Sequence, residues 1–433
     1  MSGLIMAGQL ILALTILVLI HEFGHYIAAR MFGIRVTKFF IFFDPWFKIW
    51  SKKIGDTEFG IGWLPLGGYV KISGMIDESL DTKQLKEEPK DWEFRSKPAY
   101  QRLIVMVAGV VMNVIAAILI LTMSHLVFTK EYLPVENVKE GIYAYPYARF
   151  LGFETGDKIV AIDGKKTLRY EDVFSTKLFF AETITVDRNG EIKELQMTDT
   201  LYSFLKNGGL FIELHNFSFT IDSVVQDMPI AKCNLKPGAK IISIDGDVVK
   251  SFGQMREILY YNKGKEMEFV FDNRISVDTF LLQIDSTAKL GIYTPLPVFE
   301  SKRYNFFTAL KYGWVDAYEV LKANIKGYEL IFSGKEKAKD SLQGPIGIAK
   351  IYGGVWNWAK FWRLTAIISM ILAFVNILPI PALDGGHALF LTIEAVTRRK
   401  LSDKFMEVVQ IIGMILLLGL MILVIGNDII NLF

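Results

Sequence analysis

The stretch LIMAGQLILALTILVLIHEFGH, residues 4–25, joins a long apolar run to a polar motif. The run Leu4–Ile20 carries no charged residue and leads through His21–Ala29. A helix needs about 18 apolar residues or more to cross the hydrocarbon core of a bilayer. The stretch lacks a basic start and a small-residue cleavage site, so we expect a retained membrane helix and not a cleaved signal peptide.

Three further runs, Leu103–Phe128, Leu364–Leu383 and Val408–Ile425, are equally long and apolar. The chain of 433 residues is 52% hydrophobic, above the average for soluble domains. We therefore predict four transmembrane helices. The formal net charge of +2 excludes a generally basic nucleic-acid binder, and we expect no nucleic-acid partner. The single cysteine, Cys233, excludes a disulfide framework and a cysteine-based metal site.

Lysine and arginine are clustered next to the predicted helices, which sets their orientation. The clusters consist of Arg30, Arg35, Lys38, Lys52 and Lys53; Arg95, Lys97 and Arg102; and Arg398, Arg399, Lys400 and Lys404. All three clusters lie on the cytoplasmic side if both termini and the long region 129–360 lie outside.

The long outer region contains an internal repeat. Gly156–Gly164, GDKIVAIDG, recurs as Gly238–Gly246, GAKIISIDG. Each copy combines a turn, a short β-branched strand and an Asp-Gly turn. The pattern resembles PDZ domains over about 135–215 and 216–298, which predicts two small β-rich domains inserted between membrane helices.

Two other segments have their own patterns. In residues 54–72, apolar and polar side chains alternate and glycine is frequent. Their apolar part, Ile61–Val70, predicts a membrane-associated or re-entrant β-hairpin. In 299–360, aromatic and aliphatic residues recur at helical spacing, which predicts amphipathic helices that pack or lie on the membrane surface.

The motif His21-Glu-Phe-Gly-His25 matches H-E-x-x-H. Residues i and i+4 share a helix face, so both imidazoles can reach one metal ion, and Glu22 beside them can take a proton from water. The alternative is a polar patch at the membrane edge. Polar residues within membrane helices are costly and usually functional, which favours the metal site.

Two histidines leave a catalytic zinc site one protein ligand short. Asp384, in the segment Asn376–His387 (NILPIPALDGGH), is the best candidate, because it lies at a similar depth to His21 from the outer ends of their helices. His387 is a competitor that we rank below it. The alternative role for Asp384 is that of a cap at a helix terminus, followed by Gly-Gly.

Together these features resemble the site-2 protease family of intramembrane zinc metalloproteases, and within it the bacterial regulator-of-sigma-E group. The motifs that carry the resemblance are His21–His25, Pro65–Lys71, Gly344–Ala349 and Asn376–Gly386. The resemblance implies that Zn²⁺ is held by His21, His25 and Asp384, with Glu22 as catalytic acid and base. It also implies substrate handling by Asn376, Pro379 and Pro381.

The expected function is cleavage of single-pass membrane proteins within the bilayer, in regulated intramembrane proteolysis and the envelope stress response. For the family group the substrates include an anti-sigma factor after a first outer cut, and remnant signal peptides. The expected location is the bacterial inner membrane, with the PDZ-like domains periplasmic and the active site toward the cytoplasm. The alternative is a non-catalytic scaffold, which would have no need of Glu22 between two metal ligands.

The predicted fold class is an α-helical polytopic membrane protein with four transmembrane helices, two inserted PDZ-like domains and a membrane-associated β-hairpin. The predicted segments are a first transmembrane helix at 1–30, a cytoplasmic-side segment at 31–100 with the hairpin at 54–72, a second helix at 101–128, PDZ-like domains at 135–215 and 216–298, connecting helices at 299–360, a third transmembrane helix at 361–386 and a fourth at 404–428.

Overall fold

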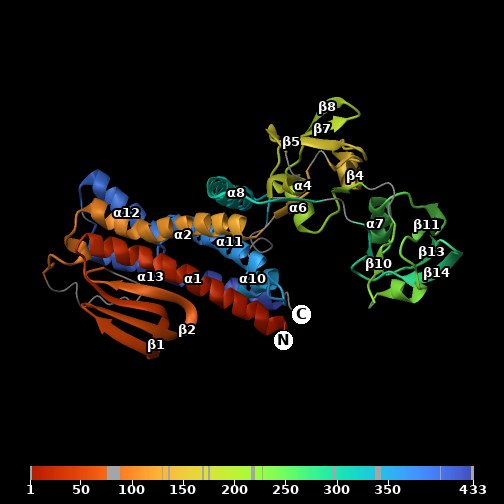
Figure 1. Cartoon of the computed structure of the whole chain (residues 1–433). Helices are drawn as coiled ribbons and strands as arrows, with labels where there is room; N and C mark the ends of the chain where they lie inside the picture. The colour runs from red at the N-terminus through yellow and green to blue at the C-terminus, as the bar shows by residue number, and fades with distance from the viewer. Residues whose placement is uncertain are drawn as a thin grey trace. The chain divides into compact units, whose positions relative to one another are not determined.

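The computed structural model divides the chain into two compact units (Figure 1). The membrane unit comprises 1–129 and 303–433, and the β unit comprises 130–302. The described residues are 2–75, 88–128, 130–134, 137–167, 170–173, 176–215, 220–226, 228–295, 299–336, 343–399 and 401–430. Met1 of the predicted first helix and parts of the predicted cytoplasmic-side segment, PDZ-like domains and connecting helices lie outside these residues.

Within the described residues, four helices of the membrane unit are long and apolar enough to span a bilayer. They are α1 (Ser2–Met31), α2 (Ala99–Val127), α11 (Trp358–Ile377) and α13 (Asp403–Ile430). The prediction of a polytopic membrane protein with inserted β domains is confirmed. Helix α2 is central, because it packs against α1, α8, α11 and α12.

Small residues let these helices approach closely. A Cβ on Gly24 of α1 would lie 2.5 Å from the Ala108 carbonyl oxygen of α2, so only glycine fits there. Such contacts are typical of helix packing in membranes, where dispersion replaces the hydrophobic effect between helices. Further along α2, Gly313 brings α8 equally close to Thr122.

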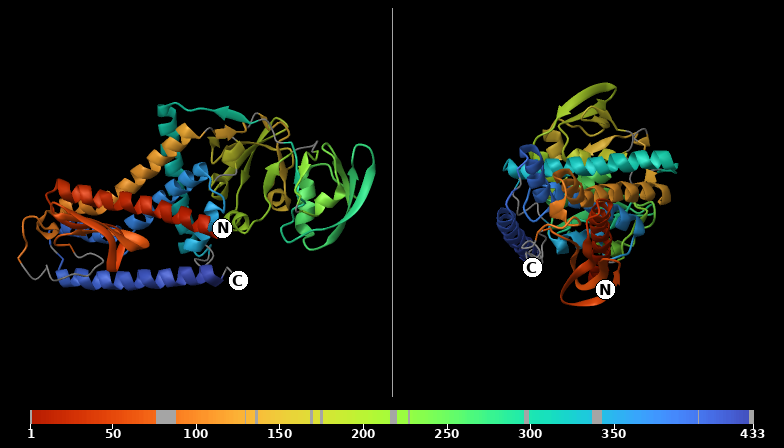
Figure 2. Two further views of the ribbon diagram at one scale, coloured as in Figure 1. Left: turned by 60° about the horizontal axis from the view of Figure 1, so that its bottom comes forward. Right: turned by 90° about the vertical axis from the view of Figure 1, so that its left-hand side faces the viewer.

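Helix α8 (Phe306–Phe332) runs across α1 and α13 and not beside them (Figure 2). The shorter helix α10 (Pro345–Tyr352) begins in the glycine-rich motif noted in the sequence. There the Asp428 carboxylate of α13 accepts hydrogen bonds from the backbone N–H groups of Gly344, Ile346 and Gly347. A carboxylate at a helix N-terminus satisfies otherwise unpaired donors, so this contact fixes α13 on α10.

The third transmembrane helix, predicted at 361–386, is not continuous in the structure. Helix α11 ends at Ile377, and α12 starts at Asp384 and runs to Thr397. Pro379 and Pro381 lie in the connection, where proline removes backbone donors and cannot continue a helix. Asp384 is therefore at the start of a new helix instead of inside a span.

The predicted hairpin at 54–72 is the second part of a larger sheet formed by β1 (Val36–Ile54) and β2 (Thr57–Ile72). Phe39 pairs with both Phe59 and Val70, while Trp50 pairs with Ile61. Each of the two long strands therefore contributes two segments to the sheet. The four segments lie side by side in the order 48–54, 57–62, 36–41 and 68–72. Segment 68–72 forms the edge nearest α1, where Gly68 adjoins the Val18 side chain.

The described part of the β unit contains two four-stranded antiparallel sheets of the same order, β6-β5-β7-β8 and β12-β11-β13-β14. In both, the repeated segment forms a strand and an Asp-Gly turn. Asp163 and Asp245 each have φ of 48° before a glycine, as a tight hairpin turn requires. The repeat thus corresponds to two β-rich modules with separate hydrophobic cores; that they are PDZ domains stays a prediction.

The elements of the β unit have the following bounds: β3 Lys130–Tyr132, β4 Ile142–Ala144, α3 Pro146–Phe150, β5 Lys158–Ile162, β6 Lys165–Lys166, α4 Tyr170–Val173, α5 Thr176–Phe179, β7 Thr183–Arg188, β8 Glu191–Gln196, α6 Thr200–Lys206, β9 Ile212–Leu214, β10 Ser223–Val224, β11 Lys240–Ile244, β12 Asp247–Val248, α7 Phe252–Tyr261, β13 Glu266–Asp272, β14 Val277–Gln283, β15 Ile292–Tyr293 and β16 Glu300–Lys302. Short 3₁₀ turns lie at Phe94–Ser96 and Pro229–Cys233.

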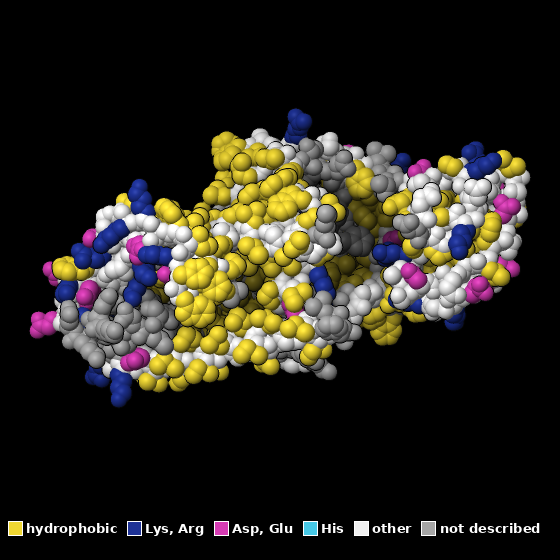
Figure 3. Space-filling model, turned by 90° about the horizontal axis from the view of Figure 1, so that it is seen from below, with side chains coloured by type: hydrophobic (Ala, Val, Ile, Leu, Met, Phe, Trp, Pro, Cys, Tyr) yellow, Lys and Arg dark blue, Asp and Glu magenta, His cyan; other side chains and the backbone are white. Residues whose placement is uncertain are grey.

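The surface of the membrane unit separates apolar from charged side chains. Figure 3 shows apolar side chains over its middle and Lys and Arg side chains gathered at the end drawn on the left. On α13, Ile415, Ile422 and Leu423 are 63–71% exposed. Such a helix is stable only where its surroundings are apolar, as in a bilayer.

Candidate metal centre

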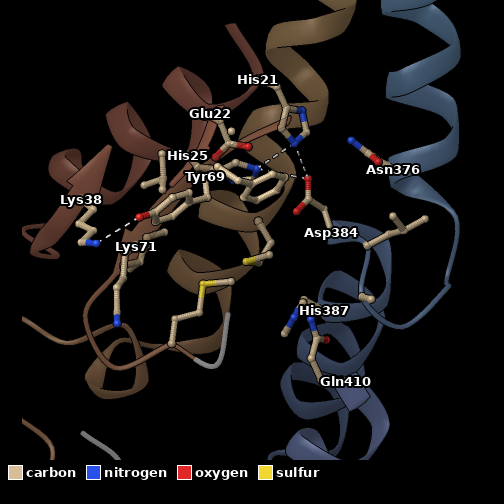
Figure 4. Close-up of a pocket in the computed structure, with 18 of the residues that line it drawn as sticks. His21, Glu22, His25, Lys38, Tyr69, Lys71, Asn376, Asp384, His387 and Gln410 are labelled. Carbon is tan, nitrogen blue, oxygen red and sulfur yellow. Dashed lines mark hydrogen bonds and ion pairs between the residues drawn. The ribbon is translucent and has the colours of Figure 1, made fainter. Parts of the chain in front are cut away.

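The two histidines of the sequence motif face each other across one turn of α1 (Figure 4). The Nε2 atoms of His21 and His25 lie 3.2 Å apart, and the rings are nearly perpendicular. His25 is buried, and its Nδ1 lies 2.8 Å from the Val105 carbonyl oxygen of α2. A carbonyl only accepts, so Nδ1 of His25 carries the proton and Nε2 presents a lone pair toward His21.

Asp384 completes the group from the N-terminus of α12. Its Oδ2 lies 3.1 Å from Nε2 of His21 and 3.2 Å from Nε2 of His25. Among the described residues, these three form a group of donors whose atoms all lie within 4.8 Å of one another. The structure thus brings together the three residues that the sequence selects as metal ligands.

The donor set and its spacing fit a zinc ion. Tetrahedral ligands about 2.0–2.1 Å from a metal lie roughly 3.3 Å from each other, close to the separations observed here. Two imidazoles and one carboxylate are also a ligand set that zinc accepts at catalytic sites. Without a cation between them, the lone pair of His25 Nε2 would repel the Asp384 carboxylate at this distance.

The connection between α11 and α12 holds Asp384 in place through its glycines. A Cβ on Gly385 would lie 2.2 Å from the Leu378 carbonyl oxygen, and one on Gly386 would lie 2.5 Å from the Ile380 oxygen. Ala382 adopts a positive φ of 75° in the same turn. Only glycine permits this close approach, so the Asp-Gly-Gly sequence is required for the position of the carboxylate.

Glu22 lies on the other side of the histidines, against the sheet. Glu22 lines the same cavity as Gly68–Ile72, the edge segment of the sheet. Glu22 is held beside the two imidazoles, where a base would contact a water molecule at the ion.

A cavity of about 640 Å³ contains the three candidate ligands and Glu22. Gly68–Ile72 form one wall, and His387 and Gln410 form part of another. The cavity is large enough for an extended peptide segment of a few residues.

The remaining site residues predicted from the sequence occupy different places. Asn376, at the end of α11, lines the cavity with its side chain on the side of His21 and Asp384 (Figure 4). Pro379 and Pro381 are not among the described residues that line the cavity. His387 turns toward Gln410 and is outside the group of three donors.

Sequence reasoning missed the contribution of α2. The Val105 carbonyl orients His25, and Gly109 leaves space for both rings, since a Cβ there would lie 2.4 Å from Nε2 of His25. From the sequence alone, Gly109 indicates only a place where two helices can pack closely. The spacing of four between Val105 and Gly109 was the available signal, but it does not identify the helix that they face.

Two imidazoles and two carboxylates gathered inside a bundle of apolar helices are the arrangement expected of an intramembrane metalloprotease. The family model of Peptidase family M50 matches residues 9–420, so the chain belongs to this family, that of the site-2 proteases. This confirms the resemblance and the prediction of a metalloendopeptidase of the site-2 type.

Several similar proteins match the chain over nearly the full length of both sequences. The chain is 28% identical to a putative zinc metalloprotease of Xylella fastidiosa, with 98% of each chain covered. It is 29% identical to the regulator of sigma E protease of Haemophilus influenzae, with 100% of each covered. It is also 29% identical to the regulator of sigma-E protease RseP of Escherichia coli, with 97% of each covered. These matches support a zinc-dependent protease of the inner membrane.

Proposed function

We propose that His21, His25 and Asp384 bind one Zn²⁺ ion and that Glu22 is the catalytic acid and base. The observation that carries this proposal is the convergence of three donor atoms from α1 and α12, separated by 3.1–3.2 Å. When bound, zinc supplies Lewis-acid chemistry to the scissile carbonyl and to water. Glu22 removes a proton from the attacking water and later gives a proton to the leaving amine.

The substrate backbone binds along the edge segment 68–72. A peptide bond inside a transmembrane helix is shielded by the hydrogen-bond ladder of that helix, so the substrate has to unwind before cleavage. In lipid, its freed backbone groups need new partners. An edge strand beside the metal supplies them by strand addition, and Asn376 offers a further donor and acceptor.

Pro379 and Pro381 contribute indirectly in this proposal. They keep the connection between α11 and α12 free of helix, which leaves irregular backbone beside the ligands where an unwound substrate can bind. Irregular backbone at membrane depth is tolerated where it lines a cavity, as the neighbouring residues Ala382 and Leu383 do.

The substrates are single-pass membrane proteins already shortened on their outer side. Two relatives are named as regulators of sigma E, which supports an anti-sigma factor as one substrate. Remnant signal peptides have the same single-helix form and are a second class. The β-rich modules act as PDZ-like domains on the periplasmic side, and the metal centre opens toward the cytoplasm, where the basic clusters lie.

The test is the Glu22→Gln variant of the purified full-length chain with a model single-pass substrate. Loss of a general acid–base group lowers the rate by roughly 10²–10⁴-fold. We expect that loss, with zinc content unchanged. Glu329→Gln, on α8 and 61% exposed, is the matched control and should cleave like wild type. Cleavage by Glu22→Gln at the wild-type rate would refute the assigned role.

A further inference from the structure

Helix α2 presents three residues, each four positions apart, to the two imidazoles. Val105 and Gly109 contact the ring of His25, and the next residue on this face is Asn113. The Asn113 amide lies 3.2 Å from Nδ1 of His21. Asn113 is 1% exposed, so this amide is buried at the level of the metal centre.

The orientation of this amide decides which nitrogen of the neutral His21 ring carries the proton. If Nδ2 of Asn113 donates, Nδ1 of His21 is the acceptor and its Nε2 carries the proton, directed at His25 and Asp384. A half-turn of the amide places Oδ1 there instead, so that Nδ1–H of His21 donates. Only the second arrangement leaves Nε2 of His21 free to bind a cation.

In the orientation of the structure, Oδ1 of Asn113 has no hydrogen-bond partner among the described residues. The half-turn gives Oδ1 a donor and moves Nδ2 to the unpaired position, so the pairing of the amide does not choose between the two arrangements. The lone pair that Nε2 of His21 needs for a cation favours the second arrangement. Ordinary helix packing at this position requires no amide, since alanine or leucine would also fill a helix interface.

The backbone of Asn113 is fixed as well. The Ser369 hydroxyl of α11 donates to the Asn113 carbonyl oxygen at 2.8 Å, and Ser369 is fully buried. This contact joins α2 to the helix that leads to Asp384. Asn113 is therefore held relative to both parts of the site and can act as a fixed acceptor for the imidazole.

We propose that Asn113 is a positioning residue, which accepts a hydrogen bond from Nδ1 of His21 and holds its Nε2 in the form and direction that bind the metal. The Val105 carbonyl does the same for His25. This inference rests on the proposed metal site. Partners of this kind fix the tautomer and ring direction of metal-binding histidines, and their loss typically weakens metal binding 10- to 100-fold.

The experiment compares Asn113→Leu, Asn113→Asp and wild type as purified full-length protein. The zinc dissociation constant is measured by competition with a chelator, and the visible spectrum of the Co²⁺-substituted protein reports ligand geometry. We expect a 10- to 100-fold weaker affinity and an altered Co²⁺ spectrum for Asn113→Leu. Asn113→Asp keeps an acceptor for Nδ1–H and should bind zinc like wild type.

Thr122→Val is the control for packing of α2, because Thr122 is equally buried but lies far along the helix from His21. It should leave zinc affinity and the Co²⁺ spectrum unchanged. Equal zinc affinity for Asn113→Leu and wild type would overturn the inference, as would equal weakening by Thr122→Val. If Asn113→Leu does not fold, the zinc affinity of Asn113→Asp decides alone. A tenfold loss of zinc affinity in Asn113→Asp would contradict the proposal.

The failure of this inference can be separated from the failure of the proposed function. If wild type binds no zinc, the proposed metal site is wrong. If wild type binds zinc tightly and Asn113→Leu binds it equally well, only the role of Asn113 is wrong.

Discussion

At the scale of single residues, the site depends on space as much as on ligands. Gly109 provides that space, because its missing side chain lets both imidazoles lie against α2. A Cβ there would lie 2.4 Å from Nε2 of His25 and 2.7 Å from Cε1 of His21. No side-chain motion of α2 can relieve these contacts, so the rings or the helix have to shift.

The Gly109→Ala variant is therefore expected to bind zinc poorly while remaining folded. Overpacking by one methyl group costs about 1–3 kcal/mol, which corresponds to roughly 10- to 100-fold in the dissociation constant. Gly327→Ala on α8 is the control, since nothing lies within 4 Å of its Cβ position. Chelator competition measures both variants. Zinc affinity equal to wild type for Gly109→Ala would show that the rings do not occupy the positions described here.

At the scale of elements, one strand edge connects the sheet to the metal centre. Segment 68–72 pairs with β1 on one side and lines the cavity on the other. Val70 belongs to this edge and lines the cavity together with Glu22. Proline is tolerated on edge strands, where one side of the strand makes no ladder hydrogen bonds.

Val70→Pro is expected to abolish cleavage of a membrane substrate without loss of zinc. The proline removes a backbone N–H from the edge that faces the cavity and obstructs strand addition along it. Val70→Thr keeps the N–H and a similar shape, and should cleave like wild type. The two variants are compared in substrate cleavage and in zinc content. Wild-type cleavage by Val70→Pro would mean that the substrate does not need this edge.

At the scale of the whole molecule, the β unit is an insertion whose two ends are paired. Strand β3 leaves the membrane unit and β16 returns to it, and Tyr132 pairs directly with Glu300. A two-residue Asn-Gly turn can join directly paired antiparallel residues. The insertion can therefore be removed without changing the spacing of α2 and α8.

Replacing residues 133–299 by Asn-Gly tests whether the β unit excludes substrates that carry a large outer domain. We expect the shortened chain to cleave a single-pass substrate with a short outer segment as wild type does. We also expect it to cleave a substrate with a folded outer domain, and we expect wild type not to cleave that substrate. Cleavage is followed by gel mobility of the products. Continued rejection of the larger substrate would show that selection by size occurs elsewhere.

Much of this architecture could be predicted from the sequence, because length and periodicity report membrane spans directly. The four apolar runs predicted the spans, and the spacing of His21 and His25 predicted a shared helix face. The pairing of β1 could not be predicted, since Phe39–Phe43 is a continuous apolar run without alternation. The third span ends at Ile377, earlier than the sequence predicts, because Pro379 and Pro381 stop the helix.

The contributions of α2 to the site could not be predicted for a different reason. Val105, Gly109 and Asn113 share one helix face, but periodicity does not show which neighbour that face meets. Their contacts with His21 and His25 join parts of the chain that are 80 or more residues apart. Only the three-dimensional arrangement distinguishes a ligand-supporting face from an ordinary packing face.

The most direct test of the central claim is elemental analysis of the purified full-length chain beside its Asp384→Ala variant. Removing one of three protein ligands from a zinc site destroys most of its affinity. We predict about one equivalent of zinc per wild-type chain and little or none in the variant, with both proteins folded. Equal zinc content in the two proteins, or no zinc in wild type, would contradict the account of a shared ion between α1 and α12.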